Sequence, residues 1–351
     1  MTQGPNNRNI WEEKIADLRR YDLDNLENDP VAPEDIISWP VPGMTFVRVD
    51  GILRSWDIER EKQQHGQQAQ QDPDPSKPPK RMYLMEDALT GLYGEKANIA
   101  FLVIGTKTGV NYYMGISQPH VTEGDDSTES PEKVAYKSLK SILHSVYGGV
   151  DVYKKPFSSD EIHELVAPLT KYTGIVTGIP ALKSTSGETI ESEQIERLAA
   201  GLAGREFAFL TLAVPIPPMN VTKEEFAVVD QIQRAQENED PEKKRKIKYY
   251  LELQDAYLKH IQLGTAVGMW LTVPYFFTND KSVFVRLQSL LRATYVDESS
   301  RPTPMRTHEV PGLATHIQQF GLLRNKRSEE VFQGMMEYKF LSPLNSRMLS
   351  A

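Results

Sequence analysis

The segment at residues 177–184, TGIPALKS, is the first place to look for chemistry, because it ends in Lys183 and Ser184 and precedes a predicted helix. A phosphate-binding loop has the pattern G-x-x-x-x-G-K-[ST], since its glycines let backbone N–H groups surround the phosphates. Here the two glycine positions hold Thr177 and Leu182. The leucine side chain occupies space that the backbone needs to approach a phosphate. The spacing therefore predicts a surface loop and no nucleotide site.

Other signatures of catalysis and metal binding are also missing from the sequence. None of the seven histidines forms an H-x-x-x-H or H-E-x-x-H pair, and no G-x-S-x-G or helix-opening G-x-G-x-x-G occurs. The lack of cysteine excludes disulfides, zinc ribbons, iron–sulfur clusters and thiol catalysis. We therefore predict a protein without catalytic residues, metal or cofactor. A hydrolase or transferase whose site is scattered along the chain stays open as an alternative.

The strongest electrostatic feature is a basic run that we take as a candidate contact for a partner or a phosphate. It follows several acidic residues, so it also suits a solvated helix start with salt bridges. Its members are Lys243, Lys244, Arg245, Lys246 and Lys248.

Composition limits the partners of the protein. The chain has 351 residues and a formal net charge of -8, which argues against a general nucleic-acid coat, although a local basic patch could bind phosphate. The start of the sequence lacks the order of a signal peptide, and the longest apolar runs are too short to span a bilayer. We expect a cytoplasmic protein without direct membrane insertion.

Hydrophobic patterning predicts an α+β or mixed α/β fold, in which helices cover layered sheets. Strand patterns occur at residues 45–53, 98–105, 110–116, 173–179, 207–214, 268–277 and 305–310, and helix patterns at 9–20, 83–93, 132–147, 159–169, 192–203 and 281–294. The length favours two domains. We expect an N-terminal helix and strand (1–58), a mobile Gln/Pro-rich insertion (59–80), a first α/β domain (81–170) and a second one (171–351).

A long helical excursion at residues 222–262 separates two strong strands of the second domain. We expect Thr222 to cap its first helix and the dipeptide Asp240-Pro241 to start its second. Such an excursion either covers the sheet or reaches outward, with the basic run near the turn between its helices. The apolar residues expected to pack on the sheet are Phe226, Val229, Ile232, Tyr250, Leu253 and Tyr257.

Several segments, taken in order, resemble the region that precedes the motor in large bacterial ATP-binding proteins of the HerA–FtsK class, which are related to type IV secretion ATPases. The segments are MEDALTGLYGEKANIAFLVIGTKTGVNYYMGIS, SLKSILHSVYGGVDV, YTGIVTGIPALKS, IERLAAGLAGREFAFLTLAVPIP and FLSPLNSRMLSA. The likeness spans residues 80–351 as a series of weak segments. The family continues into an ATPase core, whereas this sequence ends at Ala351, where that core would begin.

The resemblance implies a non-catalytic assembly or substrate-guiding module of a translocase ATPase. Its expected partners are an ATPase motor in cis or in trans, another protein, or further copies of the chain, with nucleic acid less supported. A structural or adaptor component of a large bacterial or phage assembly is the alternative. A reading frame that continues past Ala351 into a phosphate loop would separate these two hypotheses.

Overall fold

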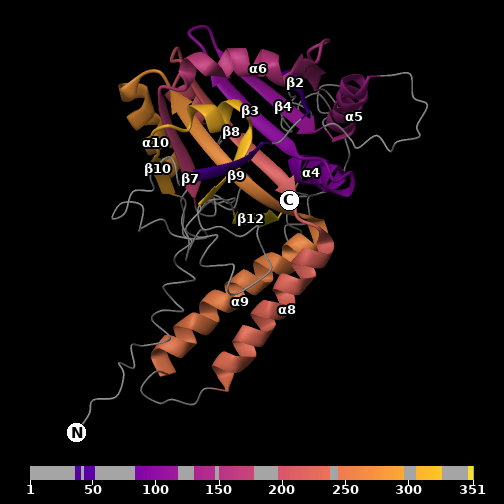
Figure 1. Ribbon diagram of the computed structural model, residues 1–351, viewed down its shortest axis with the longest axis vertical. Helices are drawn as coiled ribbons and strands as arrows, with labels where there is room; N and C mark the ends of the chain where they lie inside the picture. The colour runs from indigo at the N-terminus through magenta and orange to yellow at the C-terminus, as the bar shows by residue number, and fades with distance from the viewer. Residues whose placement is uncertain are drawn as a thin grey trace, which may run out of the picture.

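The computed structural model describes residues 36–40, 43–51, 84–117, 130–146, 150–177, 197–237, 244–295, 306–325 and 347–350 (Figure 1). The predicted helix at 9–20, the insertion at 59–80 and most of the 177–184 segment, with Lys183, lie outside these residues. Those predictions remain predictions.

The fold is built on one antiparallel sheet in the order β10-β7-β9-β8-β3-β4-β2-β5, with β12 also paired to β9 and β6 to β2. The strands are β2 (Met44–Gly51), β3 (Ile99–Gly105), β4 (Val110–Ser117), β5 (Asp151–Val152), β6 (Phe157–Ser158), β7 (Tyr172–Thr177), β8 (Phe207–Pro215), β9 (Met269–Thr278), β10 (Arg306–Glu309) and β12 (Arg347–Ser350). A separate ladder joins β1 (Ile36–Pro40) to β11 (Gly321–Asn325). The predicted α+β class is confirmed.

Alternation along the central strands gives the sheet two apolar faces. In β3, Ile99 and Val103 face one layer of helices, whereas Ala100 and Leu102 face the other. The helices are α4 (Leu84–Gly94), α5 (Pro131–Val146), α6 (Ser159–Val166), α8 (Pro218–Gln236), α9 (Lys244–Val267), α10 (Lys281–Tyr295) and α11 (Ala314–Gln318). The core clusters place α4, α5 and α10 on the face of Ile99 and Val103, and α6 and α11 on the opposite face.

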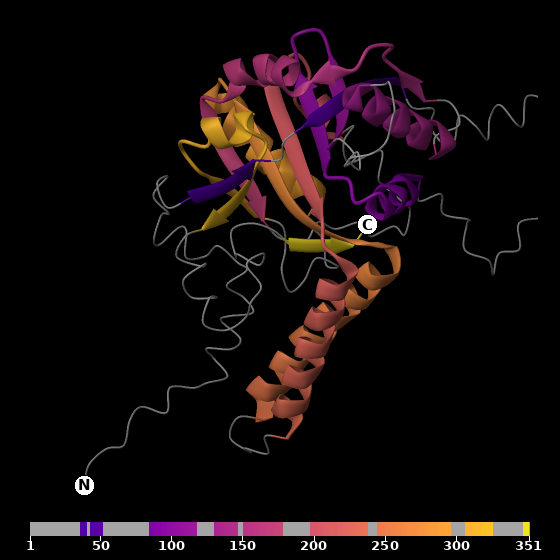
Figure 2. The same ribbon diagram turned by 45° about the vertical axis from the view of Figure 1, so that its right-hand side comes forward.

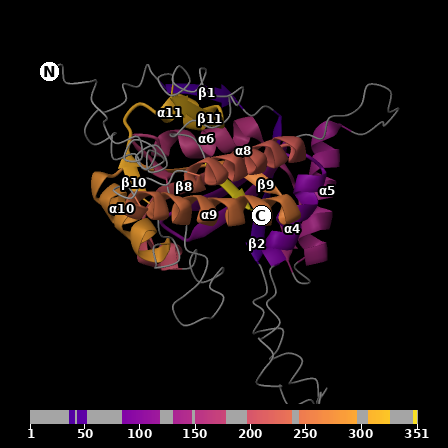
Figure 3. The same ribbon diagram turned by 90° about the horizontal axis from the view of Figure 1, so that it is seen from below.

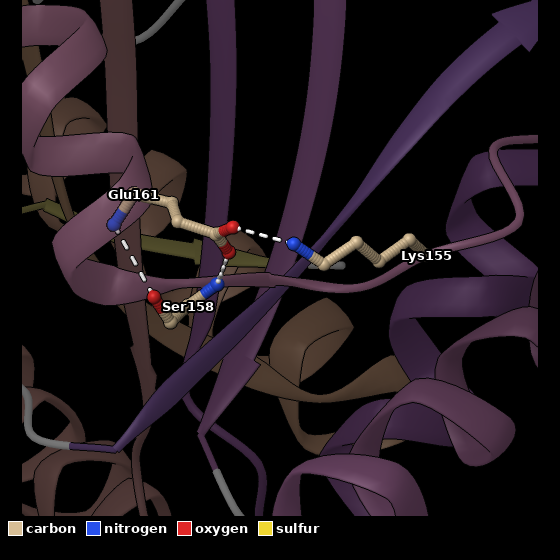
Figure 4. A network of polar contacts seen from close by, with 3 residues as sticks. All are labelled: Lys155, Ser158 and Glu161. Atoms are coloured by element: carbon tan, nitrogen blue, oxygen red, sulfur yellow. Dashed lines mark hydrogen bonds and ion pairs between the residues drawn. The ribbon is translucent and has the colours of Figure 1, made fainter.

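Helix α6 begins with a capping box formed by Ser158 and Glu161 (Figure 4). The Glu161 amide donates to the Ser158 hydroxyl over 3.2 Å, and the Glu161 carboxylate accepts from the Ser158 amide over 2.8 Å. Lys155 Nζ donates to the other oxygen of the same carboxylate over 2.8 Å. The Lys155 contact, followed by that of the Ser158 amide, lowers the pKa of Glu161. Local sequence therefore fixes where this helix starts.

The strand patterns in the sequence miss several short strands. Strand β1 precedes the first predicted strand, β5 and β6 lie between predicted elements, and β11 and β12 follow the last predicted strand. The sheet is also continuous across the predicted domain boundary at residue 171, since the whole of β3 pairs with β8. The division into two domains remains a prediction.

The helical excursion begins earlier and ends later than predicted. Helix α8 starts at Pro218, after Pro217, because proline suits the first turn of a helix. Thr222 therefore does not cap it. Its hydroxyl lies within the helix and donates to the Pro218 carbonyl over 3.1 Å. Helix α9 extends to Val267 and tolerates Gly264, which packs closely against Met269.

Candidate interaction surface

Helices α8 and α9 form a hairpin, here called the arm, that projects from one end of the sheet (Figures 1 and 2). The chain leaves the sheet at the end of β8 and returns to it at the start of β9, so both crossings lie side by side at the root of the arm. Viewed from below, the two helices run alongside each other beneath the sheet (Figure 3). The sequence left open whether the helical excursion covers the sheet or reaches outward. In the structure it reaches outward.

The two helices pack through one seam with coiled-coil spacing. Val221, Glu224, Val228 and Ala235 are buried on α8, at intervals of three, four and seven residues. The buried residues of α9 that face them include Ile247, Tyr250, Gln254 and Ile261, also three, four and seven apart. The arm therefore has a core of its own along its length.

A polar layer divides that core. The Gln254 side-chain amide donates to Gln231 Oε1 and to the Tyr250 hydroxyl, both over 2.9 Å, and Tyr250 donates to Gln231 Oε1 over 3.2 Å. Burial raises the pKa of Tyr250, so its hydroxyl stays protonated and able to donate. On the root side, Val221, Val228 and Ile261 belong to the main core of the sheet.

Towards the tip, the described residues Ala235, Ile247 and Tyr250 form a small cluster of their own, with Leu251 packed against it. This cluster is separate from the main core of the sheet.

Helix α4 holds the root of the arm at both crossings. The Tyr93 hydroxyl donates to the Ile216 carbonyl over 2.6 Å, where the chain leaves the sheet. One turn earlier on α4, the Thr90 hydroxyl donates to the Val267 carbonyl over 3.1 Å, where the chain returns. Gly268 follows with φ +107°, and a Cβ at this position would lie 2.7 Å from the Tyr93 ring. These contacts, here called the root clamp, tie the direction of the arm to the sheet.

The predicted basic run lies at the start of α9, at the end of the arm far from the sheet. Arg245 and Lys248 are exposed, and Lys248 Nζ lies 3.9 Å from Glu252 one turn further on. Lys244 and Lys246 belong to the same turn, although their side chains are outside the described ones, and Lys243 is wholly outside the described residues. Of the five basic side chains, the two that the structure describes are thus exposed, and Lys248 also pairs with Glu252. The role of the run remains a prediction.

The expected packing of the apolar arm residues on the sheet is partly wrong. Phe226 is 70% exposed on the outer side of α8, because the inner side is already filled by α9. Tyr250 is buried against α8 and not against the sheet, whereas Ile232 does pack against the main core. The side chains of Leu253 and Tyr257 are outside the described ones. Sequence reasoning therefore missed an exposed apolar surface on α8.

A second charged cluster lies on β2, near the edge of the sheet that β5 forms. Arg48 Nε donates to Asp50 over 2.6 Å, and the Arg48 guanidinium lies 4.2 Å from the centre of the Tyr153 ring. The Tyr153 ring in turn lies beside the Phe157 ring, with 5.7 Å between their centres and an angle of 31° between their planes. Because the charges of Arg48 and Asp50 are paired within the cluster, we interpret it as a structural contact that holds the short strands β5 and β6 in place.

Among the described residues, no group of three or more His, Cys, Asp or Glu side chains could hold a metal ion.

Comparison with protein-family models found no family that matches the chain, and comparison with curated proteins found no significant match. Among the helices of the described residues, none is both long and apolar enough to cross a membrane.

Proposed function

We propose that this chain is a non-catalytic assembly or substrate-guiding module of a translocase ATPase system of the HerA–FtsK class. The observation that carries the proposal is the arm: a helical hairpin, directed by the root clamp, that presents basic residues at the end far from the sheet. A rigid body with a projecting helical element is suited to docking on another protein. The resemblance of residues 80–351 to pre-motor regions supplies the class of partner.

The charges of the arm support a contact between its tip and an acidic partner. The chain as a whole is acidic, with a net charge of -8, whereas the start of α9 has no acidic residue in its first turn. Basic residues in the first turn of a helix are unfavourable for the helix dipole. An acidic surface of a motor, or the phosphate backbone of its cargo, would be attracted to this point.

Binding to a motor tests the proposal. The probe is a purified HerA–FtsK-class ATPase encoded in the same genome, and the variant carries Lys244→Glu, Arg245→Glu and Lys246→Glu. We expect the variant to bind at least tenfold more weakly, and with a flatter dependence on salt, because fewer ion pairs form. The matched control places the same charge change at exposed lysines elsewhere, in Lys107→Glu, Lys154→Glu and Lys259→Glu.

Two results would contradict the proposal. If the wild-type chain does not bind the motor at any salt concentration, the function is wrong. If the tip variant binds with unchanged affinity and salt response, the basic run is only a solvated helix start. The isolated chain is also expected to show no magnesium-dependent ATP turnover, and turnover that disappears in Lys183→Ala would indicate an enzyme instead.

A further inference from the structure

Helix α8 carries a second seam on its outer side. Met219, Lys223, Phe226, Asp230 and Gln233 follow one another at intervals of four, three, four and three residues, which places them on one face. All five are exposed, with Met219 at 67% and Phe226 at 70%. This outer seam has the spacing of a coiled-coil contact and is not covered by any described residue.

The described side chains of α9 differ from it. Those that are exposed along most of the helix are polar or charged, namely Arg245, Lys248, Glu252, Asp255, Lys259 and Gln262. Among the described side chains of the arm, the large exposed apolar ones, Met219 and Phe226, both lie on α8. Large exposed aromatic and methionine side chains in a helical seam are typical of a helix–helix interface.

We propose that the outer seam of α8 pairs antiparallel with the same seam of a second copy of this chain. The pattern is self-complementary when the two helices cross at Phe226. In that register Lys223 of each copy lies near Asp230 of the other, twice by symmetry, and the two Phe226 rings meet at the centre. A two-fold interface requires this kind of pattern, because each contact must occur in both directions.

The charges of the seam support this register over a parallel one. A parallel pairing would place Lys223 against Lys223 and Asp230 against Asp230, and like charges opposite each other are destabilising. The Asp230 carboxylate already accepts a hydrogen bond from Arg234 of its own helix over 2.6 Å, and this contact holds the carboxylate on the exposed side of α8. The antiparallel pairing gives that carboxylate a second cationic neighbour.

The proposal deepens the proposed assembly role by naming one partner, but its test needs no motor. The full chain is studied by sedimentation velocity from about 1 µM to about 1 mM, the range in which weak complexes dissociate. We expect a reversible monomer–dimer equilibrium. Phe226→Ser should weaken dimerisation at least tenfold, because a central aromatic anchor is lost. The matched control is Val285→Ser, which changes another exposed apolar residue, 51% exposed, on α10.

A charge exchange tests the register. Lys223→Glu alone and Asp230→Lys alone should each weaken self-association, since each places like charges together twice. Mixing these two variants should restore dimers, because both cross-pairs in the mixed dimer are then attractive. Mixing Lys223→Glu with Lys259→Glu, which leaves the seam intact, should not draw the Lys223→Glu copies into dimers to the same extent, because one cross-pair in that mixed dimer stays repulsive. A merely structural effect of either substitution on α8 would not be rescued by mixing.

The outcomes are separable. A wild-type chain that stays monomeric up to the highest concentration, or a dimer that Phe226→Ser leaves unchanged, overturns the pairing without touching the proposed motor partner. Loss of motor binding in Phe226→Ser with no dimer in the wild type would assign the seam to the motor and also overturn the self-pairing. If the wild-type chain forms dimers but mixing Lys223→Glu with Asp230→Lys does not restore them, the antiparallel register is contradicted, and with it the proposal as stated.

Discussion

At the scale of single residues, the cap of α6 offers a pH-dependent contribution to stability. The carboxylate of Glu161 has a lowered pKa, mainly through Lys155 and then through the Ser158 amide. A lowered folded-state pKa stabilises the fold above the unfolded-state value, and this stabilisation is lost as the pH falls through the folded-state pKa. We expect Ser158→Ala to lower the free energy of unfolding by about 1 kcal/mol at neutral pH.

Glu161→Gln isolates the charge, since an amide oxygen can still accept from Ser158. Because the Glu161 side chain is 40% exposed, the loss at neutral pH should be below about 1 kcal/mol, and it should disappear at an acidic pH below the lowered pKa of Glu161. Urea unfolding at both pH values measures this. Asp160→Asn, at the exposed neighbouring carboxylate, is the control. A loss of equal size at both pH values would show that the charge of Glu161 contributes nothing.

The cap could be predicted from the sequence because all of its atoms come from four consecutive residues. The exposure of Phe226 could not. Helix α8 has apolar residues on both of its sides, and only the position of α9 decides which side is buried. The same holds for Gln231 and Gln254, which read as surface residues in the sequence but form the buried polar layer of the arm. Such residues depend on a neighbour that lies far away in the chain.

At the scale of elements, the root clamp couples α4 to the arm. We expect Tyr93→Phe and Thr90→Val each to lower the free energy of unfolding by about 1 kcal/mol, because each leaves one carbonyl without its donor. More specifically, amide hydrogen exchange should accelerate in the first turn of α8 and at residues 267–269. Burial raises the pKa of Tyr93, so the clamp should persist throughout the neutral pH range.

Thr265→Val is the control for the clamp. The Thr265 hydroxyl donates to the Ile261 carbonyl within α9, over the same 3.1 Å as in the Thr90 contact. This substitution should leave exchange at the arm root unchanged. If the clamp variants lose stability but exchange at the root stays at the wild-type rate, α4 stabilises the fold without directing the arm.

Long apolar strands and amphipathic helices were the elements most readily predicted. The pairing of β3 with β4 and the presence of β8, β9 and α10 follow from dense apolar runs with clear ends. Among the missed strands, β1, β11 and β12 are only four or five residues long, and their partners are remote in sequence. A short segment becomes a strand because a partner segment lies beside it in the fold, which periodicity cannot reveal.

At the scale of the whole molecule, one sheet draws strands from both halves of the chain and the arm leaves it at one end. Strand β9 is central to this arrangement. Its second half pairs with β7 through Tyr275–Thr278, whereas its first half pairs with β12 through Met269–Thr272. Strand β12 also contacts α9. The last strand therefore closes the sheet at the root of the arm, on the edge that β7 leaves open.

The register of β12 can be tested directly because the chain has no cysteine of its own. Arg347 and Thr272 are opposite each other in the ladder, so the double variant Arg347→Cys/Thr272→Cys should form an intrachain disulfide under mild oxidation. It closes a loop of about 75 residues and should raise the free energy of unfolding by about 4 kcal/mol in the chain-entropy estimate.

In the control, Ser350→Cys/Thr272→Cys, the two sites are three residues out of register. That offset is about 10 Å along the strand, beyond the reach of a disulfide. Mass spectrometry after oxidation and urea unfolding with and without reductant measure both effects. Equal cross-linking of the two pairs would show that β12 does not hold this register, and cross-linking between chains in place of within them would show that the edge of β9 accepts the strand of another copy.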